Sequence, residues 1–233
     1  MRWFNNRSCL FIGILICASI LILSGCGKDN KGVEPSKVIE PVKVITPSKG
    51  VEGFTNKLMK RPVDKFSNKY DEHYITYSRK NFGRAFDWRW FKAQGQAESC
   101  QNPLAVSPVG AKGIMQIMPE TMKEIVRKNS YILNDVFNPK YSIAAGIYYD
   151  SYLYKQWRSK RPELDRIALM TSAYNCGLGN VLKAQKVCIS SNYGGCNTWN
   201  SIKSQGAKVS SWKYQETLGY VNRIFRYMGY SGY

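Results

Sequence analysis

The chain has 233 residues with 34 Lys and Arg, 16 Asp and Glu and one His, which gives a formal net charge of +18. The single His73 excludes a multi-histidine metal site, and the few carboxylates argue against an acidic calcium-binding array. The length fits one domain with an appendage, and the positive charge points to a polyanionic partner: nucleic acid, an anionic membrane surface or an acidic polymer.

The N-terminus has the organisation of a bacterial export signal. Two arginines come before an uncharged apolar run at 10–23, which is shorter than the ~20 residues that span a bilayer. The sequence Leu-Ser-Gly-Cys that ends at Cys26 resembles the lipobox of bacterial lipoproteins, in which the cysteine is lipidated. Residues 1–25 are therefore predicted to be a lipoprotein signal peptide, with an ordinary signal peptide or a short anchor as the alternative. Because Gly27 follows Cys26, the resemblance favours the outer membrane, with the rest of the chain facing the periplasm.

Export into an oxidising compartment bears on the cysteines. Beyond Cys26 there are four, an even number that predicts two disulfides, although buried free thiols remain the alternative. Cys188 and Cys196 flank a turn-rich segment and are placed to close a small loop, which leaves Cys100 and Cys176 as the second pair. Metal binding is disfavoured because none of these four has C-x-x-C spacing.

Residues 26–70 are predicted to form an extended linker. They are rich in Lys, Pro and Val and contain a hexamer repeated three times, beginning at Pro35, Pro41 and Pro47. A proline at every sixth residue blocks a helix and favours an extended, polyproline-like chain. A β-ribbon is the alternative, since Val and Ile alternate with Lys.

The remaining residues, 71–233, are predicted to form one all-α domain. Apolar residues recur with helical spacing in three stretches, at 86–97, 141–152 and 214–228. Pro119 and Pro162 are placed as first-turn prolines, and the run 167–174 is apolar nearly all round, as in a buried central helix. No stretch alternates cleanly with a period of two residues.

The segment 94–121 carries the strongest candidate for chemistry. A helix is predicted to end near Glu98, a glycine loop follows at 107–113, and a second helix is predicted to begin at Ile114. An acid that faces an apolar recess is disfavoured in its charged form, so its pKa rises toward the range that a general acid needs. Taken alone, however, a single Glu is read more simply as a solvated surface side chain.

A series of short blocks changes that interpretation. In chain order they are Glu98-Ser99, Asn102-Pro103, Ala-Val-Ser at 105–107, Gly-Ala-Lys-Gly-Ile-Met-Gln-Ile-Met-Pro at 110–119, Ala-Tyr-Asn-Cys-Gly at 173–177 and Glu-Thr-Leu-Gly-Tyr-Val at 216–221. These blocks resemble the lytic transglycosylase (SLT) domain, a relative of goose-type lysozyme, across about residues 85–228. The resemblance implies a lysozyme-like helical domain with a substrate cleft.

The resemblance also implies a reaction. Such enzymes cut the β-1,4 bond between N-acetylmuramic acid and N-acetylglucosamine in peptidoglycan without water, and they leave a 1,6-anhydromuramoyl end. Glu98 matches the single catalytic acid, which protonates the leaving oxygen and then deprotonates the muramoyl 6-hydroxyl that attacks C1. Ordinary glycosidases need two carboxylates, so a mechanism with one acid suits an acid-poor chain.

The same resemblance assigns roles to other positions. Substrate-contacting positions are matched by Ser107, Gln116, Met118, Tyr174 and Asn175, and supporting positions by Ser99 and Glu216. No metal or cofactor is implied. The expected partners are peptidoglycan strands and, through lipidated Cys26, a membrane, rather than nucleic acid, and a cell-envelope assembly is a further candidate partner.

Two departures from the family pattern concern the cysteines. The family usually has a small residue at the position of Cys176, and a bridge to Cys100 would tie the helix end that bears Glu98 to the loop that bears Tyr174. The insert 188–210 is atypical and is expected at the edge of the cleft, where it grades substrates, binds a partner or is a neutral surface loop.

Two rival functions share this fold. A hydrolytic muramidase of the goose-lysozyme type would use the same acid with water as the acceptor. A peptidoglycan-binding or assembly protein would keep the fold without turnover, but the intact Glu98, Gln116, Tyr174 and Asn175 argue against it.

Overall fold

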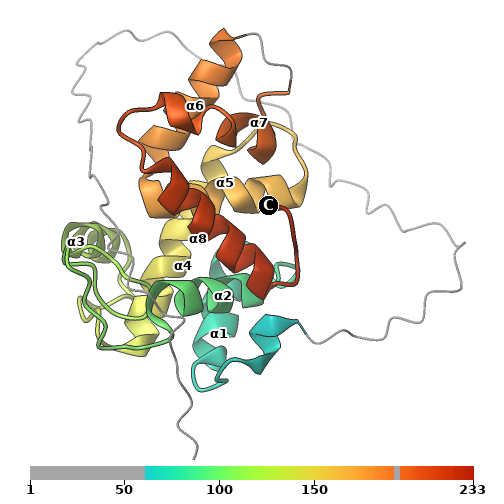
Figure 1. Ribbon diagram of the computed structural model, residues 1–233. Coiled ribbons are helices and arrows are strands. Elements are labelled where there is room, and N and C mark those ends of the chain that lie inside the picture. Colours follow the sequence, from blue (N-terminus) through green and yellow to red (C-terminus); the bar gives the residue numbers. More distant parts are fainter. Residues whose placement is uncertain (1–60, 192–194) are drawn as a thin grey trace, which may run out of the picture. The chain divides into compact units, whose positions relative to one another are not determined.

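Figure 1 shows the computed structural model, which describes residues 61–191 and 195–233. These residues form helices and no β-strand, in the order η1 (Pro62–Lys65), α1 (Asp71–Phe82), α2 (Arg89–Ser99), α3 (Pro119–Lys128), α4 (Pro139–Gln156), α5 (Glu163–Cys176), α6 (Leu178–Ser190), α7 (Trp199–Lys203), η2 (Gly206–Lys208) and α8 (Tyr214–Tyr227). The all-α prediction is confirmed. None of the helices in this part of the chain is long and apolar enough to cross a membrane. The predicted signal peptide, Cys26 and most of the linker lie outside the described residues.

α5 is the central helix of the domain, as its all-round apolar sequence predicts. Every residue from Ile167 to Tyr174 is buried, and α5 contacts α4, α6, α7 and α8 (Figure 1). A helix surrounded on all sides has no face for water, so it needs no polar stripe. The predicted stretches at 141–152 and 214–228 fall in α4 and α8, which pack against it.

The packed structure also includes residues that lie before position 71. Val63 of η1 is fully buried, and η1 contacts both α2 and α8. Two ion pairs hold this segment, from Arg61 to Asp87 at 2.7 Å and from Arg89 to Asp64 at 3.0 Å.

The loop before α3 differs from the prediction, because no helix begins at Ile114. Lys112 instead pairs with Val106 and with Ile117 as isolated β-bridges, and α3 begins only at Pro119. A proline disfavours the helical conformation in the residue before it. Met118, which precedes Pro119, is accordingly extended, with φ −68° and ψ 142°.

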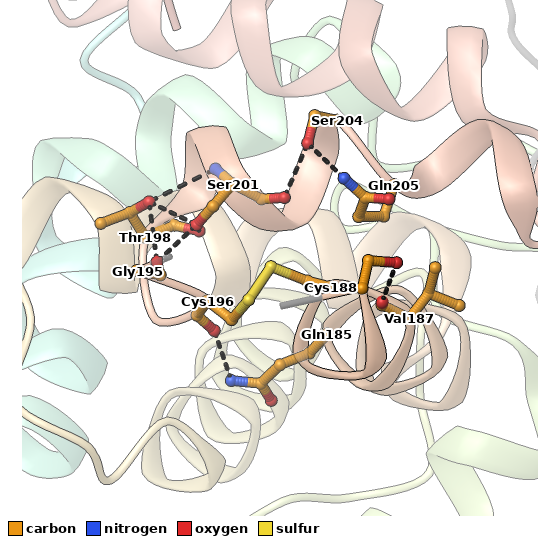
Figure 2. The surroundings of a disulfide bond; sticks show 10 residues. Gln185, Val187, Cys188, Gly195, Cys196, Thr198, Ser201, Ser204 and Gln205 are labelled. Carbon is orange, nitrogen blue, oxygen red and sulfur yellow. Dashed lines mark hydrogen bonds between the residues drawn. A yellow bond between two sulfur atoms is a disulfide. The ribbon is translucent and has the colours of Figure 1, made fainter. Parts of the chain in front are cut away.

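The predicted cysteine pairs have different outcomes. Cys188 and Cys196 form a disulfide, which Figure 2 shows beside the carbonyl of Cys196 that accepts from Gln185 Nε2 at 3.0 Å. The bridge between Cys100 and Cys176 is wrong, because Cys176 carries a free thiol. As the last residue of α5, Cys176 is buried next to Thr217 of α8, and burial raises the pKa of its thiol to about 12 despite that contact.

Candidate active site

Glu98 lies in the last turn of α2, where the helix is stopped by two residues with left-handed backbones. Cys100 and Gln101 have φ angles of 56° and 65°, and the N–H of Gln101 donates to the carbonyl of Gly95 at 3.3 Å. This conformation ends the helix one residue after Glu98. The acid therefore sits at the junction of α2 and the glycine loop, as the sequence predicts, and only 9% of it is exposed.

Burial keeps the carboxyl group of Glu98 neutral. It raises the pKa of Glu98 to about 8, although a hydrogen bond from Tyr220 and the charge of Arg223 act in the opposite direction. The Tyr220 hydroxyl donates to Oε1 at 2.5 Å, whereas Oε2 is buried and has no hydrogen-bond partner among the described residues. Near pH 7 the group is mostly protonated, and Oε2 is the oxygen left to hold a transferable proton.

The glycine loop is shaped by hydrogen bonds from side chains to its own backbone. Ser107 Oγ accepts from the N–H of Ala111 at 3.0 Å. Gln116 Nε2 donates to the carbonyl oxygens of Gly113 at 2.9 Å and Ala105 at 3.2 Å. The side chains of Ser107 and Gln116 are both buried, and their hydrogen bonds lie within the loop. The sequence predicts both as substrate contacts, whereas in the structure they shape the loop backbone.

A positive φ angle at Gly113 brings this loop against the segment before α4. Its φ is +74°, and a Cβ there would lie 2.1 Å from the carbonyl oxygen of Val136. A side chain at this position would therefore push the loop away from its support.

Two hydroxyl groups join the loop to the helices that carry the acid and its neighbours. Ser99 Oγ donates to the carbonyl of Ile114 at 2.9 Å, and Tyr174 OH donates to the carbonyl of Met115 at 2.7 Å. Burial and the nearby Glu98 carboxyl both raise the pKa of Tyr174, so its hydroxyl remains a donor. These bonds fix the distance between α2, the loop and α5.

Asn175 begins a second chain of buried hydrogen bonds. Its Oδ1 accepts from Thr217 Oγ1 at 2.8 Å, and that hydroxyl accepts in turn from Trp212 Nε1 at 2.8 Å. The chain connects the end of α5 with the start of α8. It holds Asn175 in place beside Tyr174 without any charged group.

The two remaining predicted positions, Met118 and Glu216, are only partly buried. Met118 is half-buried just before α3. The carboxylate of Glu216 lies 4.0 Å from the ammonium group of Lys213, and 21% of its side chain is exposed. The residue of α8 that contacts the acid is Tyr220, one helical turn after Glu216.

Sequence reasoning missed Tyr220, Thr217 and Asp150. The first two belong to the matched block at 216–221, and their spacing from Glu216 was the available signal. Asp150 of α4 is a second buried acid: Gln94 Nε2 donates to its Oδ1 at 3.4 Å, and its Oδ2 has no partner among the described residues. Burial is the main cause that raises the pKa of Asp150.

The described side chains offer no metal site. Nowhere in residues 61–191 and 195–233 do three or more His, Cys, Asp or Glu side chains lie close enough together to hold an ion. The groups that surround Glu98 are phenol and amide side chains and the glycine loop.

Comparisons with known proteins agree with the blocks found in the sequence. The sequence model of the transglycosylase SLT domain matches residues 74–194. The membrane-bound lytic murein transglycosylase F of Shewanella pealeana is 29% identical over 171 residues, which cover 69% of this chain and 34% of that protein. The protein of the same name from Yersinia enterocolitica is 31% identical over 152 residues, which cover 60% of this chain and 30% of that protein. The chain thus spans about a third of the length of these curated relatives.

Solved structures show the same fold. The 70 kDa soluble lytic transglycosylase of Escherichia coli superposes with a TM-score of 0.54 at 27% identity, over 71% of this chain and 24% of that one. An inactive mutant of the lytic transglycosylase Slt from Pseudomonas aeruginosa gives a TM-score of 0.55 at 23% identity, over 73% of this chain and 25% of that one. The lysozyme-like helical fold expected from the sequence is thereby confirmed.

Proposed function

This chain belongs to the transglycosylase SLT domain family, and from that premise we propose that it is a lytic transglycosylase of peptidoglycan. In this proposal it cleaves the β-1,4 bond between N-acetylmuramic acid and N-acetylglucosamine and leaves a 1,6-anhydromuramoyl end. The observation that carries the proposal is the state of Glu98, a buried carboxyl group with a pKa of about 8. One of its oxygens accepts a hydrogen bond from Tyr220, and the other has no hydrogen-bond partner among the described residues.

The first step uses Glu98 as an acid. Its Oε2 proton passes to the glycosidic oxygen, the bond from that oxygen to C1 of the muramoyl residue breaks, and the N-acetylglucosamine side leaves as an alcohol. The carboxylate that forms on Glu98 accepts the hydrogen bond of Tyr220 and is stabilised by the charge of Arg223. Both interactions favour the ionised form, so they strengthen as the proton leaves.

The second step uses the same group as a base. The muramoyl 6-hydroxyl attacks C1 and gives its proton to Glu98, which returns to the neutral form without consuming water. An intramolecular nucleophile needs no second carboxylate to activate water, and its confinement near C1 supplies an orientation advantage. This agrees with the absence of a hydrogen bond between Glu98 and any other carboxylate in the described residues.

The predicted binding residues fit this scheme as a rigid frame. Ser107, Gln116 and Tyr174 hold the backbone of the glycine loop, so the loop carbonyls and amides present a fixed surface to a sugar. We propose that Met118 contributes to the cleft wall and that Asn175 contacts the sugar next to the bond that breaks. Ser99 and Glu216 are proposed as supporting residues.

We also infer that the protein is held at a membrane through lipidated Cys26, with the catalytic domain facing the periplasm from the outer membrane. The lipobox-like sequence supports this, and the similar proteins named above are described as membrane-bound. The substitution Cys26→Ala is expected to move the protein from the membrane fraction to the soluble fraction. An unchanged distribution would contradict the lipid anchor.

Mass spectrometry of the muropeptides released from purified sacculi tests the reaction. A transglycosylase releases products with an anhydro end, which are lighter by one water than the products of a hydrolytic muramidase. Glu98→Gln is expected to lower the release by about 10³-fold or more, because a general acid contributes about 10²–10⁴-fold and here serves in both steps. Binding of this variant to sacculi should persist, and full activity in it would overturn the proposal.

A further inference from the structure

A basic groove lies on the domain away from the glycine loop, between α6 and the segment that includes η2. Its volume is about 440 Å³, within the range of ligand sites in proteins. The residues that line it are Lys183, Lys186, Val187, Ser190, Ser191, Lys208, Val209, Ser210 and Ser211. The lining thus combines three ammonium groups and four hydroxyl groups with two valines.

The positive charge of this groove is not balanced nearby. No acid lines it, and none of its three lysines forms an ion pair with a described residue. Residues 166–215 contain six Lys or Arg and no Asp or Glu. Charges that are left exposed and unpaired in a concave site attract an anionic ligand more strongly than the same charges spread over a convex surface.

The two walls of the groove are fixed to each other. Lys183 Nζ donates to Ser211 Oγ at 3.3 Å, and the Ser211 hydroxyl donates to Asn180 Oδ1 at 2.6 Å. Past the end of α6, the disulfide between Cys188 and Cys196 ties the chain back to the helix (Figure 2). A groove that keeps its shape without ligand loses less conformational entropy on binding.

The wall that bears Ser211 continues directly into the active site. The next residue, Trp212, donates to Thr217, which holds Asn175. Three residues after Thr217, Tyr220 contacts Glu98. A ligand bound in the groove would therefore contact the start of the segment 211–220, whose later residues position Asn175 and Glu98.

We propose that this groove binds the carboxylate-bearing peptide of a peptidoglycan strand while the glycan lies in the active site. The proposal rests on the proposed function and adds a second contact to the same substrate. Lysine ammonium groups and serine hydroxyls suit carboxylates, and the valines suit the methyl side chains of a short peptide. A peptide is favoured over a phosphate polymer because Val187 and Val209 offer it an apolar floor that a phosphate chain would not use.

The test measures binding of a synthetic stem tetrapeptide with free carboxylates to the full chain by calorimetry. The triple variant Lys183→Gln, Lys186→Gln, Lys208→Gln is expected to bind about tenfold more weakly, since three exposed ion pairs are lost. A matched control, Lys155→Gln, Arg158→Gln, Lys160→Gln, removes the same charge from exposed positions outside the groove and should stay within about twofold of the wild type.

Further arms identify the ligand. The same peptide with amidated carboxylates should not bind, and binding of the free form should weaken in high salt. Tighter binding of poly(glycerol phosphate) than of the peptide would overturn the proposal, and so would equal peptide binding by the two triple variants.

Cleavage assays separate this proposal from the proposed function. The groove variant should have a raised KM on peptide-bearing sacculi and an unchanged KM on glycan strands from which the peptides have been removed. An equal rise on both substrates would overturn the groove as a peptide site. If the wild type cleaved neither substrate, the proposed function would fail, while the calorimetry would still decide the groove.

Discussion

The surroundings of Glu98 and the basic groove differ in whether their ionisable groups are buried or exposed to water. Glu98 is buried and mostly neutral near pH 7, and the hydrogen bonds around it end largely on backbone atoms. In the groove, the side chains of Lys183, Lys186 and Lys208 are exposed to water, and hydrogen bonds between side chains join Lys183 to Ser211 and Ser211 to Asn180. Protonation of a neutral glycosidic oxygen needs an acid that stays protonated near pH 7. Binding of an anionic ligand needs positive charges that are exposed to that ligand.

The difference also concerns rigidity. The loop beside Glu98 is fixed by buried bonds from Ser99 and Tyr174, which water does not weaken. The walls of the groove are joined by the hydrogen bonds of Lys183 and Ser211, with the disulfide beyond the end of α6, and the lysine and serine side chains of its lining are exposed. We therefore expect changes at the first region to alter the rate of the reaction and the pH dependence of stability, and changes at the second to alter substrate capture.

The largest expected effect is on stability at Glu98. Its pKa is about 8 in the folded protein against an ordinary value of 4.5, so the folded state binds more protons across this window. Its contribution is fully present below pH 4.5 and is lost as the pH rises toward 8, by about 3–5 kcal/mol. Glu98→Gln should make this slope shallower in urea unfolding between pH 5 and pH 8, and the part that remains is expected from Asp150, whose pKa burial also raises. Glu120→Gln, at an exposed position, should leave the slope unchanged, and a slope in Glu98→Gln as steep as in the wild type would contradict the raised pKa of Glu98.

The disulfide is the next largest effect and belongs to the other region. The double variant Cys188→Ser, Cys196→Ser should lower the free energy of unfolding by about 2–3 kcal/mol, because a short covalent loop is released in the unfolded chain. Chemical unfolding measures this, and calorimetry should show weaker peptide binding. Turnover of peptide-free glycan should be unaffected at a temperature where both proteins are folded. A parallel loss of that turnover would show that the two regions are not separable.

Tyr220→Phe separates catalysis from burial within the first region. Without the hydroxyl, the carboxylate formed on Glu98 loses a donor, so kcat should fall about 10- to 30-fold, as for a hydrogen bond to a charged group. The same bond lowers the pKa of Glu98, so its loss should move the alkaline limb of the pH–rate profile to higher pH. Tyr214→Phe, on the same helix, is the control. A fall in kcat with no movement of that limb would assign Tyr220 a purely structural part.

The sequence was sufficient for the elements whose signal is local. The all-round apolar run in α5 predicts a buried helix, and the position of Glu98 before a glycine loop predicts an acid at a helix end. The start of α3 at Pro119 is also predicted, but the helix expected from Ile114 is wrong. The proline disfavours the helical conformation at Met118, so the chain just before α3 is extended.

Contacts between distant segments were out of reach of the sequence. Tyr220 lies 122 residues from Glu98, and no spacing reveals that α8 packs on α2. Whether Cys176 could form a disulfide depends on the direction of its side chain in the last turn of α5. The thiol of Cys176 lies next to Thr217 and is free. The acid-free run 166–215 is visible in the sequence, but only the fold makes part of it concave.

Asp150 gives the smallest expected effect and the finest test of the comparison, since it is a second buried acid close to the first. Burial raises its pKa, and one of its oxygens has no partner among the described residues, so it destabilises the fold where the unfolded chain would ionise it. Asp150→Asn keeps an acceptor for Gln94 and should raise the free energy of unfolding at pH 8 by about 1–2 kcal/mol. The gain should shrink as the pH falls and vanish well below 3.8, the ordinary pKa of an Asp, where the carboxyl group is neutral in both states. Cleavage of sacculi should continue at the wild-type rate, because the proposed mechanism needs one acid. A large loss of activity would instead make the two acids a functional pair, and the single-acid interpretation of this region would be wrong.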